Sequence, residues 1–551
     1  MISLITQSFS IFKYPIILGI FIIIDLFLLT RINYKGLFKN FGLIKVNWFF
    51  IAVFVILFFS LFSVHYNYSG TISTLKEEKE INHMKNPYPY YPDEWICVAL
   101  IKYSISSGKL PLVNPLWHNV TFPNFNLPFH TFSSGLVLIL GLNPLNNFAI
   151  LPLLGGLLIC LLVYFILRLN NISTYAAGIA SLLMLYVLNS TALPGVWYYL
   201  PVTLGAIFML FSFISISQNN KKMVIFNSFF ALIFYPPLFI FVLASIIPYF
   251  LFNEKIKIKR YLITFLVICI IAAIFISIII IPITKSSKYI VEHLFYTLIS
   301  NAIPDFSIIK IIPIITLIFG ALGLFAIGKE FKKKLWLIAP IFLGLIFWII
   351  YSRNVWRIII EYDRIIFLTS IFITILAGFG LEYIFEYLKK EKIRKYNLAK
   401  VGIIALIIFF ILAFSYTSGD EWRELKLRSI IGGGESSSEA PANQHLTNAD
   451  LELFKDIHEK NFLSYPTKGL VIGTATGNYP IISKGATITN AALDYSKFKK
   501  ENCANKLKIA KEKQIAYIYM DKIECSWAEL INVSNEGLYL YKVNIESVSK
   551  N

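Results

Sequence analysis

The sequence has few charged residues and few cysteines, and each shortage excludes a class of protein. Charged residues make up 15% of the 551 residues, against about 25% in an average soluble protein. Five cysteines are too few for a disulfide scaffold in a chain of this length. Apolar residues instead reach 57%, with 48 phenylalanines and a mean hydropathy of +0.67. Since a soluble protein of this size cannot bury so much apolar surface, the composition predicts a polytopic α-helical membrane protein.

The charge balance is basic, at +18 from 50 Lys and Arg against 32 Asp and Glu. In a soluble protein this balance would suggest a nucleic-acid partner. Here the basic residues gather in short loops between apolar runs, which is typical of the cytoplasmic loops of membrane proteins. We therefore expect membrane lipids as partners and no nucleic acid.

About twelve helices are predicted to cross the membrane. Two apolar runs, at 14–30 and 48–64, precede a polar loop at 65–132, and the others follow it. The run at 223–252 is too long for one crossing and contains Pro236 and Pro237, so we expect two short helices there. The remaining runs lie at 146–168, 174–190, 196–216, 261–283, 311–328, 335–351, 365–385 and 401–416.

The alternate loops differ in charge, and this difference predicts the topology. One set is short and net basic, from Arg31–Lys45 to Lys389–Lys400, and is expected in the cytoplasm. The other set, which includes the loop at 65–132, then lies outside. The chain thus divides into a transmembrane domain at 1–417 and a soluble extracytoplasmic domain at 418–551, in the plasma membrane.

The tail at 418–551 is predicted to be a small α/β domain. A Gly- and Ser-rich stretch at 430–438 precedes it, and Thr447-Asn448 is a candidate helix cap. Strands are expected at 469–473, 515–520 and 538–543, with a Lys-rich helix at 496–513. Cys503 and Cys525 either pair, as they could outside the cell, or stay as two buried thiols. The tail contains neither a Gly-rich phosphate loop nor a zinc-spaced Cys/His pattern.

The loop at 65–132 contains the most informative segment, in which Asp93 and Glu94 follow Pro92 and open a predicted helix. Its expected apolar face is Ile96, Ala99, Leu100 and Tyr103. Acids in a first turn are favoured by the helix dipole, so a capping pair on a solvated loop is the simpler interpretation. The functional interpretation is that Asp93 and Glu94 are catalytic and that the neighbouring aromatic residues, Tyr91 and Trp95, bind a sugar or an isoprenoid.

In this region the chain resembles the GT-C superfamily of membrane glycosyltransferases. The shared features are the acidic pair, a helix followed by Gly108-Lys109-Leu110-Pro111, the entry Pro128-Phe129-His130, and a soluble C-terminal domain after many helices. The resemblance implies an enzyme that moves a sugar, with inversion, from a polyprenyl-phosphate carrier to a glycan, lipid or protein acceptor on the outer face. It also implies that Asp93 or Glu94 is the base or a metal ligand. The tail contains no counterpart of the Trp-Trp-Asp signature of oligosaccharyltransferases, which argues against protein N-glycosylation.

Such a transfer also needs cations to hold the departing phosphate. The candidates are Arg353, Arg357, Arg364 and, in the loop at 284–310, Lys285 and Lys288. Arg364 is favoured because it begins an apolar helix, where a lone charge is costly, and because its guanidinium can bond two phosphate oxygens. Pairing with Glu361 or Asp363 is the structural alternative.

The sequence does not identify a cofactor, although it is compatible with a divalent metal ion. Asp93, His118 and His130 together could form a metal site, whereas ordinary loop histidines are the simpler interpretation. Sequons, which also arise by chance, occur at Asn67, Asn119, Asn189 and Asn532, on the outer side or at its boundary.

Two other functions compete with a GT-C transferase. A transporter or flippase of lipid-linked saccharides would need paired charges and internal repeats at the membrane midplane, and it would not need an outer domain. A polysaccharide polymerase or ligase would place its basic residues in later outer loops, which Arg353 to Arg364 fit in part.

Overall fold

A computed structural model represents the chain, and it describes part of the residues. The described residues are 2–8, 12–13, 16, 47–66, 68–73, 78–84, 89, 92–121, 124, 126–187, 196, 198–252, 312–352, 362–390, 402, 446–481, 495–534 and 537–544. The chain forms two compact units. Residues 27–65 and 150–433 form the helical unit, and residues 1–26, 66–149 and 434–551 form the loop–tail unit. The predicted outer loop and the C-terminal domain therefore belong to one unit.

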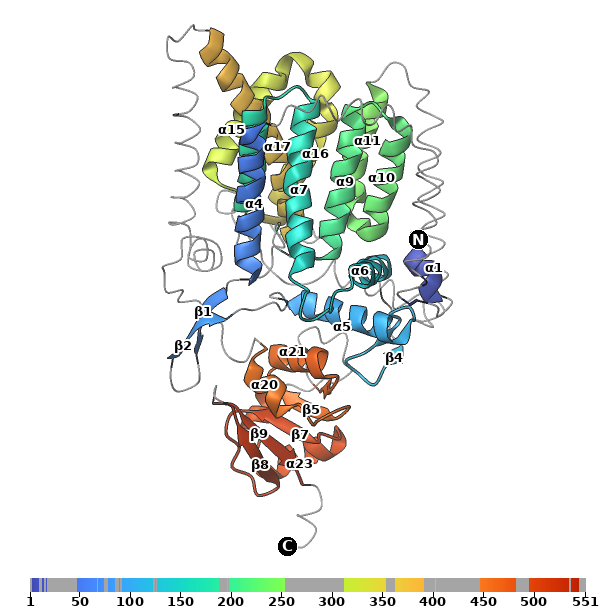
Figure 1. The fold of residues 1–551 in the computed structure, drawn as a ribbon, viewed down its shortest axis with the longest axis vertical. Helices are drawn as coiled ribbons and strands as arrows, with labels where there is room; N and C mark the ends of the chain where they lie inside the picture. Colours follow the sequence, from blue (N-terminus) through green and yellow to red (C-terminus); the bar gives the residue numbers. More distant parts are fainter. Residues whose placement is uncertain are drawn as a thin grey trace. The chain divides into compact units, whose positions relative to one another are not determined.

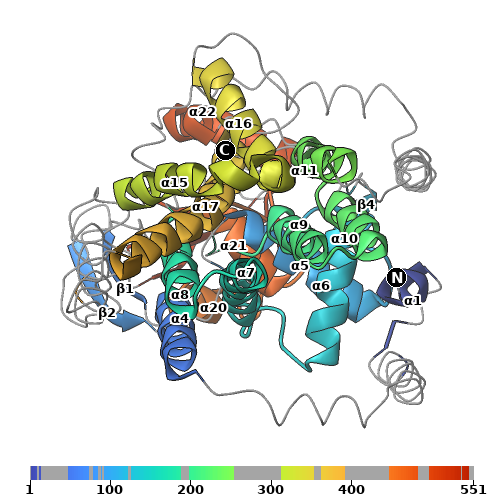
Figure 2. The same ribbon diagram turned by 90° about the horizontal axis from the view of Figure 1, so that it is seen from above.

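The helical unit contains long apolar helices that run side by side (Figures 1 and 2). Their bounds are α4 Trp48–Tyr66, α7 Ile150–Leu169, α8 Thr174–Leu183, α9 Pro201–Ser217, α10 Lys221–Phe234, α11 Phe239–Leu251, α15 Ile314–Ile327, α16 Phe331–Ser352 and α17 Tyr362–Lys390. Among the described residues, three stretches are long and apolar enough to cross a membrane, at Ile150–Leu169, Phe331–Ile350 and Arg364–Lys390. The predicted spans at 14–30, 261–283 and 401–416 lie outside the described residues, so the total of twelve stays a prediction.

The break predicted in the run at 223–252 is confirmed. Helix α10 ends at Phe234, a 3-10 turn follows at Pro236–Leu238, and α11 begins at Phe239. Proline lacks the N–H that would continue the helical ladder, and its ring clashes with the preceding turn. The two prolines therefore divide one apolar run into two helices.

Glycines bring α15 and α17 into backbone contact. A Cβ atom at Gly323 would lie 2.0 Å from the carbonyl oxygen of Leu376, and one at Gly380 would lie 2.0 Å from the carbonyl oxygen of Phe319. Small residues at such crossings let helices approach closely and gain dispersion contacts. Any larger side chain at Gly323 or Gly380 would push these two helices apart.

The N-terminal part of the loop–tail unit is a string of short elements. These are α1 Ile2–Ser8, the hairpin of β1 Tyr68–Ser73 and β2 Glu78–Met84, α5 Pro92–Ser107, the hairpin of β3 Val113–Asn114 and β4 Val120–Thr121, and α6 Leu127–Ile139. The helix predicted after Pro92 is thus confirmed as α5. The prediction of one apolar face was too narrow, because Trp95, Cys97, Val98 and Ile101 are buried as well. Helix α5 is enclosed on most sides.

The tail folds as an α/β domain, as predicted, and its helices lie on both faces of the sheet. Its sheet has the strand order β6-β5-β7-β9-β8, with β5 Asn461–Ser464, β6 Tyr479–Pro480, β7 Tyr517–Met520, β8 Ala528–Val533 and β9 Tyr539–Val543. Helices α20 Asn448–Leu453 and α21 Pro466–Thr476 lie on one face, where Phe454 and Ile472 meet Phe462 and Tyr519. Helices α22 Tyr495–Lys500 and α23 Cys503–Glu512 lie on the other, where Phe498 and Leu507 pack.

Three details of the tail differ from the prediction. The strand expected at 469–473 is wrong, because these residues form α21, which begins at Pro466 and ends at the left-handed Gly477 with φ of +79°. A short continuous apolar run suits a buried helix as well as a strand, so the pattern alone did not decide. The helix expected at 496–513 is two helices, because the side chain of Asn502 caps α23 by accepting a bond from the Asn505 N–H. Strands β5, β6 and β8 were not predicted.

The helix cap at Thr447 and the strands at 517–520 and 539–543 are confirmed. Of the two alternatives for Cys503 and Cys525, the structure has the disulfide bond. It ties the start of α23 to the loop before β8, and the Trp527 Nε1–H donates to the Cys503 carbonyl at 2.9 Å beside it.

Candidate active site

The first turn of α5 holds the two candidate carboxylates in different surroundings. Pro92 starts the helix because its fixed φ suits this position and its missing N–H would have no partner there. Asp93 is exposed, whereas Glu94 is only 1% exposed. Since neighbouring residues on a helix differ by about 100° in direction, the two acids face different sides. Asp93 is therefore on the surface of the described residues, and Glu94 lies inside the fold.

Of the two aromatic residues predicted to bind a substrate beside the acids, the structure describes Trp95. Trp95 is 3% exposed, so its ring packs inside the protein and offers almost no surface to a sugar. Tyr91 lies outside the described residues. One turn further, burial raises the pKa of the Cys97 thiol well above its usual value, and the charges of Asp93 and Glu94 raise it further. Cys97 is therefore a neutral thiol.

Helix α21 of the tail packs directly against α5 (Figure 1). The Lys102 ammonium donates to the carbonyl oxygens of Thr474 at 2.7 Å and Ala475 at 3.1 Å, in the last turn of α21. The Thr474 hydroxyl donates to the Trp95 carbonyl at 3.4 Å. A cation is favoured at a helix C-terminus because carbonyl groups and the negative end of the dipole lie there. The tail thereby fixes the helix that bears the candidate carboxylates.

A second contact joins the loop to the tail through the β3–β4 hairpin. The Trp117 ring packs on the core beneath α22 and α23, and the His118 ring lies 4.0 Å from that of Tyr479, between ring centroids. His118 and Asn119 both have positive φ, 45° and 51°. Such backbone is strained for residues other than glycine and marks a tightly specified turn. The loop and the tail therefore meet at two places.

The predicted metal trio is not assembled. His130 is 4% exposed on α6, and its Nδ1 lies 3.0 Å from the Asn124 Oδ1. Burial lowers the pKa of His130 to about 3, so the ring is neutral. The His118 ring instead packs against the Tyr479 ring in a tilted arrangement. Within the described parts of the chain, no three His, Cys, Asp or Glu side chains form a group that could hold a metal ion, Asp93 included.

The candidate phosphate-binding cations belong to the helical unit. Arg364 is the third residue of α17 and is half-buried, as expected for a charge at the start of an apolar helix. Arg353, Arg357, Lys285 and Lys288 lie outside the described residues, so their position is not tested. Below Arg364, hydroxyls such as that of Thr369, which donates to the Ile365 carbonyl at 2.7 Å, are satisfied within the helix.

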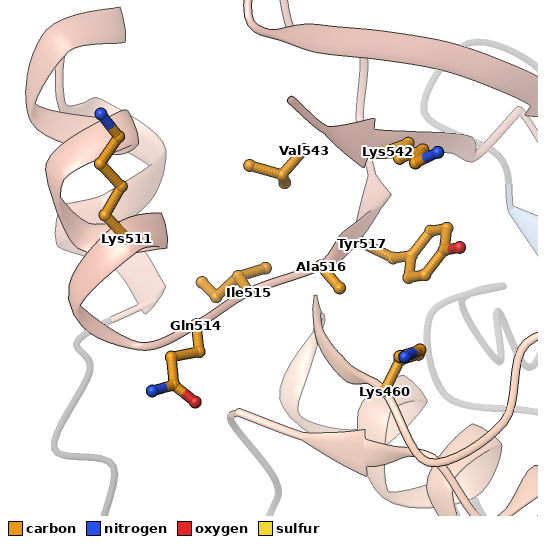
Figure 3. Close-up of a pocket in the computed structure, with 8 residues that line it drawn as sticks. All are labelled: Lys460, Lys511, Gln514, Ile515, Ala516, Tyr517, Lys542 and Val543. Carbon is orange, nitrogen blue, oxygen red and sulfur yellow. The ribbon is translucent and has the colours of Figure 1, made fainter. Parts of the chain in front are cut away.

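The tail also has a pocket of about 320 Å³ at one end of its sheet (Figure 3). Its floor is Ile515, Ala516 and Val543. Lys511 of α23 stands on one side, and Lys460, Tyr517 and Lys542 stand on the other. None of the candidate catalytic, binding or metal-ligating residues predicted from the sequence lines it. Lysines are its only charged lining residues, so it attracts anions rather than cations.

Sequence reasoning missed Lys102, Thr474 and Tyr479. A single signal pointed to Lys102, because a lysine in the otherwise apolar stretch of α5 needs a polar partner. The partner lies 372 residues further along the chain, and no local pattern could have identified it.

Comparison with known proteins concerns the fold. No family model and no curated protein matches the sequence. A crystal structure of the Archaeoglobus fulgidus oligosaccharyltransferase, tethered to an acceptor peptide with the NVT sequon, matches with a TM-score of 0.52 and 13% identity. The match covers 87% of this chain and 69% of that chain.

Two further structures of Archaeoglobus fulgidus oligosaccharyltransferase match with TM-scores of 0.48. The apo form is 12% identical and covers 87% of this chain and 70% of that one. AglB in complex with an inhibitory peptide and a dolichol-phosphate is 13% identical, and the match covers 86% of this chain and 69% of that chain. On the first match, the chain has a fold similar to that of this oligosaccharyltransferase. The helical fold with a small sheet domain that we expected from the sequence is confirmed, whereas the number of membrane crossings is not tested.

Proposed function

We propose that this chain is a GT-C membrane glycosyltransferase that transfers a saccharide from a polyprenyl-phosphate carrier to an acceptor, with Asp93 as the general base. The observation that carries the proposal is the placement of the acid pair. In a chain with the fold of an oligosaccharyltransferase, a solvent-accessible and a buried carboxylate open a helix that the C-terminal domain holds in place.

The chemistry assigns different work to the two acids. Transfer forms a bond from the acceptor atom to the anomeric carbon of the sugar and breaks the bond from that carbon to the phosphate oxygen. The acceptor must lose a proton, and Asp93 is placed to take it because it is exposed and short. Attack from the side opposite the phosphate inverts the anomeric carbon. Glu94, buried one position further along, positions the first turn of α5.

The departing phosphate needs positive charge. Arg364 supplies a guanidinium at the start of α17, with Arg353, Arg357 and Lys288 as its proposed partners. A guanidinium can bond two phosphate oxygens at once, which holds a dianionic group more firmly than a lysine can. The carrier chain would lie in the hydrocarbon beside the apolar helices.

The acceptor is the least constrained part of the proposal. The neighbouring structure with a TM-score of 0.52 was solved with a tethered acceptor peptide that contains the NVT sequon, which favours a peptide. The sequence contains no Trp-Trp-Asp, however, which favours a glycan or lipid acceptor. The transfer experiment therefore offers a peptide, a glycan and a lipid as acceptors.

The active face is proposed to be extracytoplasmic. The alternation of basic loops puts the loop at 65–132 and the tail outside. The Cys503–Cys525 disulfide supports the same side, since such bonds form and persist outside the reducing cytoplasm.

The decisive experiment uses the purified full-length chain in lipid with a radiolabelled polyprenyl-phosphate saccharide. We expect label to move to one of three offered acceptors, an Asn-Val-Thr peptide, a glycan or a lipid. Asp93→Asn is the matched control, because it changes the acid and keeps its shape. Donor binding without transfer to any acceptor, identical in both forms, would contradict the proposal and favour a flippase.

A further inference from the structure

Two sequons of the loop–tail unit, at Asn119 and Asn532, lie in very different local structure. Attachment of a glycan to asparagine requires that the side-chain amide and the hydroxyl two residues later are both accessible, and it occurs on surface loops. The sequence pattern alone treats the two sites as equal. The structure separates them.

Asn119 ends the turn of the β3–β4 hairpin, and Val120 and Thr121 form the short strand β4. All three residues are exposed, and Val120 is 50% exposed. Asn119 adopts the left-handed conformation with φ of 51°, which asparagine tolerates better than other residues with a side chain. The contacts with the tail are made by its predecessors Trp117 and His118. A glycan on Asn119 would therefore extend into solvent without disturbing them.

Asn532-Val533-Ser534 lies at the edge of the tail sheet, in β8 and just beyond it. Asn532 pairs with Leu540 across the ladder, and its Oδ1 accepts a bond from the Val533 N–H at 2.8 Å. Ser534 is 6% exposed, and its hydroxyl accepts a bond from the Leu538 N–H at 3.1 Å. The hydroxyl that the modification requires is thus buried and engaged, so this sequon is closed.

We propose that Asn119 is an N-glycosylation site of this protein and that Asn532 is not. An oligosaccharyltransferase on the outer face joins the Asn119 Nδ2 to the anomeric carbon of a lipid-linked saccharide. The bond from that carbon to the carrier phosphate breaks, the phosphate oxygen keeps the electron pair, and one Nδ2 proton passes to a base. The inference rests on the extracytoplasmic placement in the proposed function, and it does not require that this chain itself transfers the glycan.

The test is the glycan occupancy of each sequon, measured by mass spectrometry of peptides from the full-length chain isolated from its native membrane. We expect glycan on the peptide containing Asn119 and none on the peptide containing Asn532. Asn119→Gln and Thr121→Val should each abolish the modification, and Asn532→Gln should change nothing. An unmodified Asn119, an occupied Asn532, or occupancy that survives Thr121→Val would overturn the inference.

A labelling control separates this inference from the proposed function. Lys109 is exposed in the same loop, and Lys109→Cys should react in intact cells with a thiol reagent that does not cross membranes. An unmodified Asn119 in a loop that is labelled overturns the inference alone. A loop that is not labelled overturns the proposed topology and the inference with it.

Discussion

The C-terminal domain and the helical unit keep buried polar groups in different ways. In the domain, Lys468 and Asp450 are both fully buried and form an ion pair, and the Tyr519 hydroxyl donates to the same carboxylate at 2.9 Å. In the helical unit, buried hydroxyls such as those of Ser245 and Thr374 donate to carbonyls one turn earlier. The first arrangement requires folding around a charge pair. The second brings no charged group into the apolar interior.

Against this background, the few buried charged side chains can be compared with one another. Apart from His130, the described part of the chain has three buried titratable side chains that are ionised at neutral pH in water, Glu94, Asp450 and Lys468. Lys468 and Asp450 pair with each other in the C-terminal domain. Glu94 lies on α5, in the first turn. Arg364 is half-buried at the start of a long apolar helix. Charges that are costly to bury and that do not serve the domain core are candidates for function.

The largest expected effect on stability comes from breaking the ion pair of the domain. Lys468→Met leaves the Asp450 charge buried without its partner, and such a change typically costs about 3–5 kcal/mol. Hydrogen exchange of C-terminal peptides in the full-length chain would measure the loss. The double variant Lys468→Met/Asp450→Asn should regain part of it. A loss of less than about 1 kcal/mol in the single variant would contradict the account.

A pH effect is expected from His130, which lies on α6, a helix of 13 residues and too short to cross the membrane. Its pKa is about 3 in the fold and about 6.5 in an unfolded chain. Between these values the unfolded state binds the extra proton, so stability falls as pH decreases, by about 1.4 kcal/mol per unit at most.

The measurement is thermal unfolding of the loop–tail unit in the full-length chain between pH 7 and pH 4. His130→Gln should lose most of the slope, whereas His118→Gln, at an exposed position, should keep it. Equal slopes in all three proteins would show that His130 is not the group responsible.

The charge at the start of α17 should act on the donor and not on the fold. Arg364→Lys keeps the charge but loses the planar guanidinium that can bond two phosphate oxygens at once. The dissociation constant of a polyprenyl-phosphate saccharide should therefore rise about tenfold to a hundredfold. Arg168 donates to the Ile172 carbonyl in the same unit, and Arg168→Lys is the matched control, with no change in donor binding. Unchanged binding in Arg364→Ala would make Arg364 a structural partner of its acidic neighbours.

The smallest effect is expected where the domain holds α5. Lys102→Met removes both bonds to the last turn of α21 and should lower kcat by about tenfold, or about 1.4 kcal/mol, with the donor KM unchanged. Lys102→Arg should restore most of the rate because a guanidinium also reaches two carbonyls. Lys109→Met, beyond the end of the same helix, should behave like the natural protein. A raised KM with normal kcat would place Lys102 in binding instead of positioning.

The sequence predicted the features that depend on nearby residues. Pro92 with two acids predicted the start of α5, and Pro236-Pro237 predicted the break between α10 and α11. The residues Leu470 to Ile472 were assigned to a strand, because a short apolar run does not distinguish a buried helix from a strand. Their burial on all sides follows from the sheet on one face and α5 on the other.

The candidate site was only partly predictable for the same reason. Which of two adjacent carboxylates is exposed depends on the direction in which α5 is packed, and α21 contributes to that packing from the far end of the sequence. The burial of Trp95 and the separation of His118 from His130 depend on the same tertiary contacts. No spacing rule contains this information.

The most direct test of the central claim compares Asp93→Asn with Glu94→Gln in single-turnover transfer by the full-length chain. If Asp93 is the base, Asp93→Asn should slow transfer by about a hundredfold to ten-thousandfold while donor binding and expression stay normal. Glu94→Gln should cost less, because it alters the support and keeps the base. Equal and mild effects from both substitutions would contradict the account and reduce the pair to a helix cap.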